Sequence, residues 1–76
     1  MTNEIYLNCK ALLKETAKEA KKSNPKDKPY IRQCINDEAD SLCKQIDFHA
    51  MKGTISEKQA NLYKLWISNY ACFLHP

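Results

Sequence analysis

Residues 23–29 read SNPKDKP, and this stretch interrupts an otherwise helical pattern. Pro25 biases Asn24 away from helical geometry, so a first helix has to end close to this point. Asp27 is a good cap for a following helix, and Pro29 then falls in the first turn, where its missing N–H costs nothing. The stretch therefore predicts two helices joined by a short linker.

Upstream of the linker, apolar residues recur at steps of three and four residues, which is the spacing of one helical face. We expect a helix over about residues 3–22, capped at its start by Thr2 or Asn3. Its predicted buried face comprises Ile5, Cys9, Leu12, Leu13, Thr16 and Ala20, flanked by Tyr6 and Ala17.

Downstream of the linker, the same periodicity predicts a second helix over about residues 29–51. Glu38 falls inside its apolar stripe. Because an unpaired buried carboxylate is costly, either Glu38 has a partner or the stripe opens there. Gly53 suits the left-handed conformation that ends many helices. The predicted buried face consists of Ile31, Ile35, Ala39, Leu42 and Ile46, extended by either His49 or Ala50.

Ser56 and Gln59 have the spacing of a capping box, which predicts a third helix over about residues 57–74. The three helices would be of similar length, and short connections favour packing between antiparallel neighbours. The sequence thus predicts an all-α fold, an antiparallel three-helix bundle in which residues 1–76 form a single domain.

The composition is that of an ordinary soluble domain. Apolar residues make up 43% and charged residues 28% of the 76 positions, and no run approaches the roughly 20 apolar residues needed to span a bilayer. The N-terminus lacks the basic and apolar regions of a signal peptide. We therefore expect a cytoplasmic protein with no membrane partner, whose cysteines are reduced core thiols. These cysteines are Cys9, Cys34, Cys43 and Cys72.

No residue pattern points to a metal, cofactor or catalytic site. Successive cysteines are 25, 9 and 29 residues apart, whereas structural zinc sites usually contain a pair separated by roughly two to four residues. Cys72 and His75 lie about one helical turn apart, but no third group or Gly-rich turn accompanies them. The acidic side chains of Asp37 and Asp40 are expected to be solvated. We expect no enzymatic activity, no cofactor, no bound metal and no small-molecule substrate.

Positive charge is concentrated in the first part of the chain. Residues 1–32 hold eight Lys or Arg and four acids, a net +4, whereas residues 33–76 hold four and five, a net −1. The basic row resembles a phosphate-contacting strip, although Glu15 and Glu19 border it and base recognition usually employs Arg, Asn or Gln. A nucleic-acid-binding accessory protein is therefore the alternative function, weighed against a merely solvated face. Its candidate residues are Lys10, Lys14, Lys18, Lys21, Lys26, Lys28 and Arg32.

The third helix has a wide apolar arc, with four aromatic side chains within residues 63–73. Either the small bundle needs these side chains for its core, or one edge of the arc is exposed and binds a partner chain. The leading hypothesis is a non-enzymatic protein-interaction module that binds a host protein or self-associates as a homodimer. The exposed edge would lie around Tyr63, Ile67 and Leu74, or around Leu65 on the other side. The candidate contact residues are Tyr63, Leu65, Trp66, Ile67, Tyr70 and Leu74.

Two segments carry a resemblance to other proteins. DKPYIRQ at residues 27–33, followed by IND at 35–37, and NYACFLHP at 69–76 are similar to segments of short uncharacterised proteins of bacterial phages and other mobile elements. The resemblance covers residues 27–76 and implies no activity and no functional residue. It implies only a class, because accessory proteins of such elements often block a host protein or modulate nucleic-acid transactions.

Overall fold

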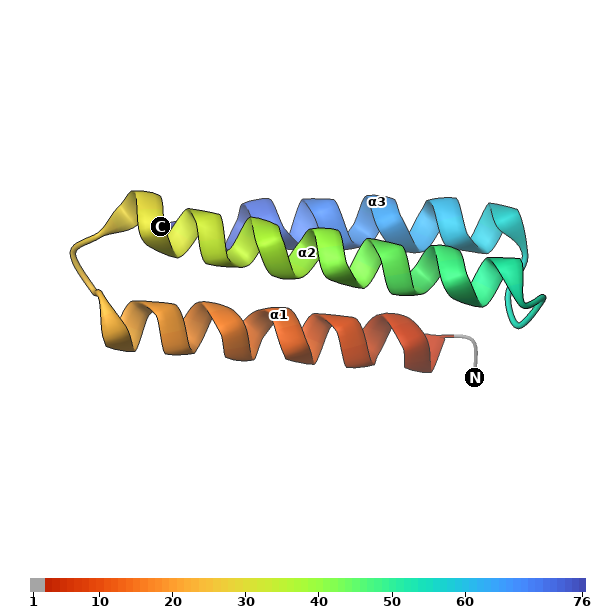
Figure 1. The fold of residues 1–76 in the computed structure, drawn as a ribbon, viewed down its shortest axis with the longest axis horizontal. Coiled ribbons are helices and arrows are strands. Elements are labelled where there is room, and N and C mark those ends of the chain that lie inside the picture. The colour runs from red at the N-terminus through yellow and green to blue at the C-terminus, as the bar shows by residue number, and fades with distance from the viewer. Residues whose placement is uncertain (1–2) are drawn as a thin grey trace.

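The computed structural model describes residues 3–76, which fold into three helices (Figure 1). These are α1 (Asn3–Ser23), α2 (Lys28–Met51) and α3 (Glu57–Leu74). Each helix runs opposite to the one before it, so α1 and α3 are parallel, and every pair of helices is in contact. The predicted all-α, antiparallel three-helix bundle is confirmed. The predicted cap at Thr2 or Asn3 lies outside the residues whose side chains the structure describes.

Local sequence signals set the helix ends, and every predicted boundary falls within one residue of the observed one. At the start of α2, the Asp27 carboxylate accepts a hydrogen bond from the backbone N–H of Tyr30 at 3.1 Å. At the start of α3, the Gln59 backbone N–H donates to Ser56 Oγ at 3.1 Å, and the Ser56 N–H donates to Gln59 Oε1 at 3.0 Å. The predicted capping box is therefore present, and it satisfies backbone groups that a helix end leaves without partners.

Gly53 adopts a φ of +80° in the turn after α2, as its position after the helix predicts. A Cβ added there would meet nothing within 4 Å, so the cost of Gly53→Ala lies only in the left-handed backbone. We expect this variant to lower the free energy of unfolding, measured by urea denaturation, by about 1–2 kcal/mol. Gly53→Asn should lose less, because Asn tolerates this conformation better. An unchanged stability of Gly53→Ala would contradict the positive φ.

The core contains apolar side chains from all three helices. In α2 the first five residues of the predicted face are buried, and both candidates for the sixth position, His49 and Ala50, are half-buried. In α1 the buried arc is turned relative to the prediction, because Leu12 is 49% exposed whereas Ala17 is buried. The physical reason is that α1 packs against α3 as well as α2, so its buried arc extends from Leu13 towards α3. The expectation that Leu12 belongs to the core was therefore wrong.

Charged side chains stay at the surface of the bundle. Within residues 4–76 none of them is buried, and Glu38 is half-buried, so the apolar stripe of α2 opens to solvent at this point. Lys64 of α3 pairs with Asp47 of α2 at 2.7 Å, and this hydrogen bond raises the pKa of Lys64. Exposed pairs of this kind add little stability, so apolar burial is the main force that holds the helices together.

Candidate functional site

Three aromatic rings join the start of α1 to the middle of α3. The ring centroid of Tyr6 lies 5.1 Å from that of Trp66 in an edge-on arrangement and 6.5 Å from that of Tyr63 in a stacked one. The Tyr63 and Trp66 centroids are 5.6 Å apart. Tyr63 is buried and Trp66 is half-buried. Because ring pairs at these distances attract one another beyond their area of contact, this cluster fixes α3 against α1.

The burial of α3 corrects part of the predicted contact surface. Tyr63 and Ile67 lie in the core, so they are not available to a partner, and the expectation that they are exposed was wrong. Trp66, Tyr70 and Leu74 are half-buried and pack against the core. The reason is that α1 and α2 both contact α3 and cover most of its apolar arc. These apolar side chains of α3 therefore serve the core of the small bundle.

The remaining exposed apolar side chains of α3 lie on its outer edges. Leu65 is 56% exposed, as expected of a contact residue, and Leu62 is also exposed although it was not predicted as one. Leu62 and Trp66 are four residues apart and share a side of the helix. On α1, Leu7 is 56% exposed and follows Tyr6, which contacts Trp66. We call Leu7, Leu62, Leu65 and the accessible edge of Trp66 the apolar strip. The N-terminal ends of α1 and α3 lie at the same end of the bundle (Figure 1), and the strip extends from there to the middle of α3.

The opposite end of the bundle is basic. Here α1 and α2 continue past the last residues of α3 towards the linker (Figure 1). Lys10 Nζ lies 5.0 Å from the centroid of the Tyr70 ring, so the side of α1 that carries Lys10 faces the end of α3. The lysines four, eight and eleven residues further on continue this side of α1 beyond α3. They are Lys14, Lys18 and Lys21, all exposed.

The second helix borders the same space. Nε2 of His75, which follows α3, lies 2.9 Å from Oδ1 of Asn36 on α2. Arg32 and Lys28 precede Asn36 by four and eight residues, so they lie on this side of α2 nearer the linker, and both are exposed. We call Lys14, Lys18, Lys21, Lys28 and Arg32 the basic platform; the exposed Lys26 lies beside it in the linker.

The acidic side chains of α1 and α3 lie mostly on other sides of the helices, whereas Asp40 follows Asn36 by one turn on the platform's side of α2, farther from the linker. Glu19 lines a hollow between α1 and α2, away from α3. Glu15 precedes it by one turn on the same flank of α1. Glu57 lies near Lys64, where its charge helps to raise the pKa of that lysine. Asp27 belongs to the basic end, but its carboxylate caps α2. The five cations of the basic platform therefore face solvent together.

One aromatic side chain stands beside the basic platform. Phe73 is 79% exposed, and its ring stacks on that of Tyr70 with centroids 5.9 Å apart and planes inclined by 20°. The Tyr70 ring is in turn the one that Lys10 approaches. The prediction had omitted Phe73 from the contact residues, although its spacing of eleven residues from Leu62 places both on one side of α3.

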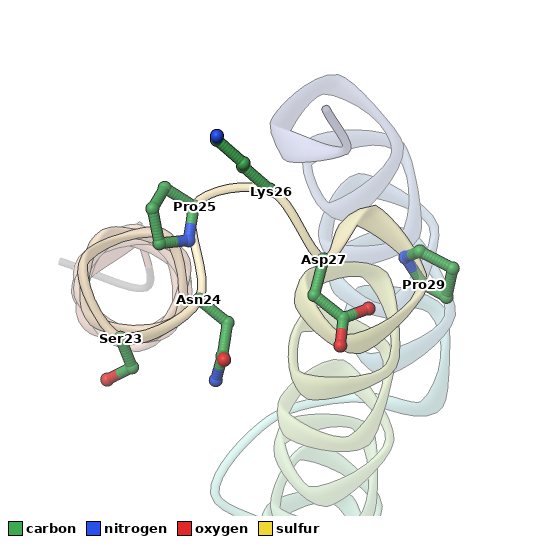
Figure 2. A pocket seen from close by; sticks show the side chains of 6 residues that line it. All are labelled: Ser23, Asn24, Pro25, Lys26, Asp27 and Pro29. Carbon is green, nitrogen blue, oxygen red and sulfur yellow. The ribbon is translucent and has the colours of Figure 1, made fainter.

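The linker between α1 and α2 encloses a shallow hollow of about 500 Å³. Its lining side chains point in different directions, with Lys26 turned away from Asp27 (Figure 2). The lining residues are Ser23, Asn24, Pro25, Lys26, Asp27 and Pro29. Ligand sites usually have polar groups that converge on one point, so this hollow lacks the features of a small-molecule site.

The side chains that suggested metal or nucleophilic chemistry remain apart. No group of three or more His, Cys, Asp or Glu side chains that could hold a metal ion comes together in the described part of the chain. The His75 ring contacts Asn36, and Cys72 is exposed on α3. Within the described residues, the His75 ring is thus directed at Asn36 and not at the Cys72 thiol.

The four thiols are free but differ in burial. The expectation of core thiols was wrong for Cys72, which is exposed, whereas Cys9 is buried. Burial raises the pKa of the Cys9 thiol, assisted by the charges of Cys43 and Glu38, and burial likewise raises the pKa of Cys43. Only the thiolate is nucleophilic, so burial and a raised pKa both slow the reaction of a thiol.

We therefore expect Cys72 to react first with a disulfide reagent at pH 8 and Cys9 last, as followed by mass spectrometry. In strong denaturant the rates should become similar, and fast labelling of Cys9 in the native protein would contradict its burial. The free energy of unfolding should also depend on the ionisation of Cys9. The contribution of the Cys9 thiol is fully present below the pKa of the unfolded chain and is lost as pH rises through the higher pKa of the folded one.

No model of a known protein family, no curated protein sequence and no solved structure matches the chain. Among the helices of residues 3–76, none combines the length and the apolar character required to cross a membrane.

Proposed function

We propose that the chain is a small non-enzymatic protein-interaction module that binds a partner protein through the apolar strip. The observation that carries this proposal is the exposure of Leu7, Leu62 and Leu65 beside the edge of Trp66. Grouped apolar side chains of this size on a small domain are typical of interaction sites, and Trp is favoured there because it combines a large apolar area with a polar N–H.

The strip is held in a fixed shape before a partner binds. Trp66 is clamped by two rings, and the leucines stand on helices rather than loops. Less side-chain entropy is then lost on binding, which favours affinity for a given contact area. The partner is a host protein, in keeping with the resemblance to accessory proteins of phages and mobile elements, or a second copy of the chain related by a twofold axis.

The proposal is tested with a strip variant, Leu62→Ser/Leu65→Ser, and a matched control, Phe48→Ser/Met51→Ser, which removes two exposed apolar side chains from α2. Sedimentation equilibrium measures self-association, and a pull-down from host-cell extract measures binding of other proteins. We expect the affinity of the strip variant for its partner to fall by at least about 10-fold, while the control keeps its affinity. The reason is that a few central apolar residues carry most of the binding energy. The proposal would be refuted if the wild type were monomeric and captured no protein that the strip variant does not also capture.

A further inference from the structure

We infer that the basic platform and the ring of Phe73 form a binding site for single-stranded nucleic acid, distinct from the apolar strip and nearer the linker. The first argument is charge. Five cations border the space beyond the end of α3, while the acids of α1 and α3 lie on other flanks or near Lys64, and Asp40 of α2 lies one turn farther from the linker than Asn36. Phosphate is the complementary group, because each phosphate neutralised by Lys or Arg releases counterions.

The second argument is the position of the exposed ring. Phe73 presents most of its surface to solvent. Its ring stacks on Tyr70, which holds it in place near Lys10, where the row of lysines from Lys10 to Lys21 begins. Proteins that bind single strands without sequence preference combine a cationic track for the backbone with aromatic rings on which bases stack. An acidic protein partner would use the cations but has no need of an exposed flat ring.

The third argument concerns the shape of the site. From Lys14 to Lys21 the row extends about 10 Å along α1, and Lys28 and Arg32 lie across from it on α2. This length suits a few nucleotides of a flexible strand. A duplex reader would instead place a helix in the major groove, with Arg, Asn or Gln at its base edges. Here the helix next to the platform ends in apolar residues that pack on the bundle, so we expect single strands to bind more tightly than duplexes.

Fluorescence anisotropy with an end-labelled 12-nucleotide oligothymidylate tests the site in the whole chain. With five phosphate contacts, the logarithm of the association constant should fall with the logarithm of salt concentration with a slope of about −3.5. Lys14→Gln/Lys21→Gln should reduce the magnitude of this slope by about 1.4 and weaken binding by about 10- to 100-fold at 50 mM salt. Lys44→Gln/Lys58→Gln makes the same change in net charge on other surfaces and should have little effect.

Substitutions at Phe73 separate stacking from charge. Phe73→Ala should weaken binding by about 5-fold or more, and Phe73→Leu should weaken it as well, whereas Phe73→Trp should retain affinity because it keeps an aromatic face. The strip variant Leu62→Ser/Leu65→Ser should bind the oligonucleotide normally, so failure here is distinguishable from failure of the protein-interaction proposal.

Three results would overturn the inference. The first is an equal loss of affinity in the two lysine variants, which would show that net charge alone is responsible. The second is binding of polyglutamate as tight as that of the oligonucleotide together with an inert Phe73→Ala, which would assign the platform to an acidic protein. The third is the absence of binding to the oligonucleotide at 50 mM salt.

Discussion

Leu13→Ala is expected to lower the free energy of unfolding by about 2–5 kcal/mol. Leu13 is 0% exposed and lies at the centre of the buried arc of α1, so its truncation removes apolar burial and leaves a cavity. A domain of 76 residues has a total stability of only about 4–11 kcal/mol, so this loss is a large share of it. Urea denaturation followed by far-UV circular dichroism measures the change.

The neighbouring leucine provides the control. Leu12→Ala makes the same chemical change in the same helix, but half of the Leu12 side chain already contacts solvent. We expect a loss below about 1 kcal/mol, because little apolar area returns to water and no closed cavity forms. Equal losses for the two variants would contradict the observed orientation of α1 and would favour the arc expected from its sequence.

Tyr63→Ala is expected to cost about 3–5 kcal/mol, the range found for buried aromatic residues. Its ring is buried against the rings of Tyr6 and Trp66, so the substitution removes the buried member of the cluster that joins α1 to α3. Thermal unfolding by circular dichroism measures the loss, and a red shift of Trp66 emission in the native state would report the opening of the cluster.

Phe73 is the matched control on the same helix. Because most of its ring contacts solvent, Phe73→Ala should change stability by no more than about 0.5 kcal/mol. A large loss would show that this ring is needed for folding, and the nucleic-acid site would then lose its stacking group. The pair of variants thus separates the aromatic side chains of α3 that hold the fold from the one that is free to bind.

The two proposals place two binding surfaces one after the other along one bundle. The apolar strip lies near the start of α1 and in the first half and middle of α3, and the basic platform lies where α3 ends and α1 and α2 continue. If both proposals hold, the chain brings a protein and a nucleic acid close together, because the seven residues from Leu7 to Lys14 span only about 10 Å of α1.

The candidate sites were only partly predictable. The lysines could be named from sequence because long charged side chains are almost always exposed. Which of the cations border one space could not be predicted. Lys14 on α1 and Arg32 on α2 border the space beyond α3 only because the linker reverses the chain and α3 ends early. Among the apolar residues of α3, Tyr63 and Ile67 were assigned to the surface although both are buried, and Phe73 was omitted although it is exposed.

Local chemistry in the sequence by itself determined the helices and where they end. Pro25, Asp27, Gly53 and the Ser56–Gln59 box act on backbone geometry and hydrogen bonds within a few residues, so no distant contact is needed to interpret them. Only the tertiary structure decided which side of each helix is covered. The apolar arcs of α1 and α3 are wider than a single partner helix can bury, so the placement of a second neighbour determines that Ala17 is buried and Leu12 exposed.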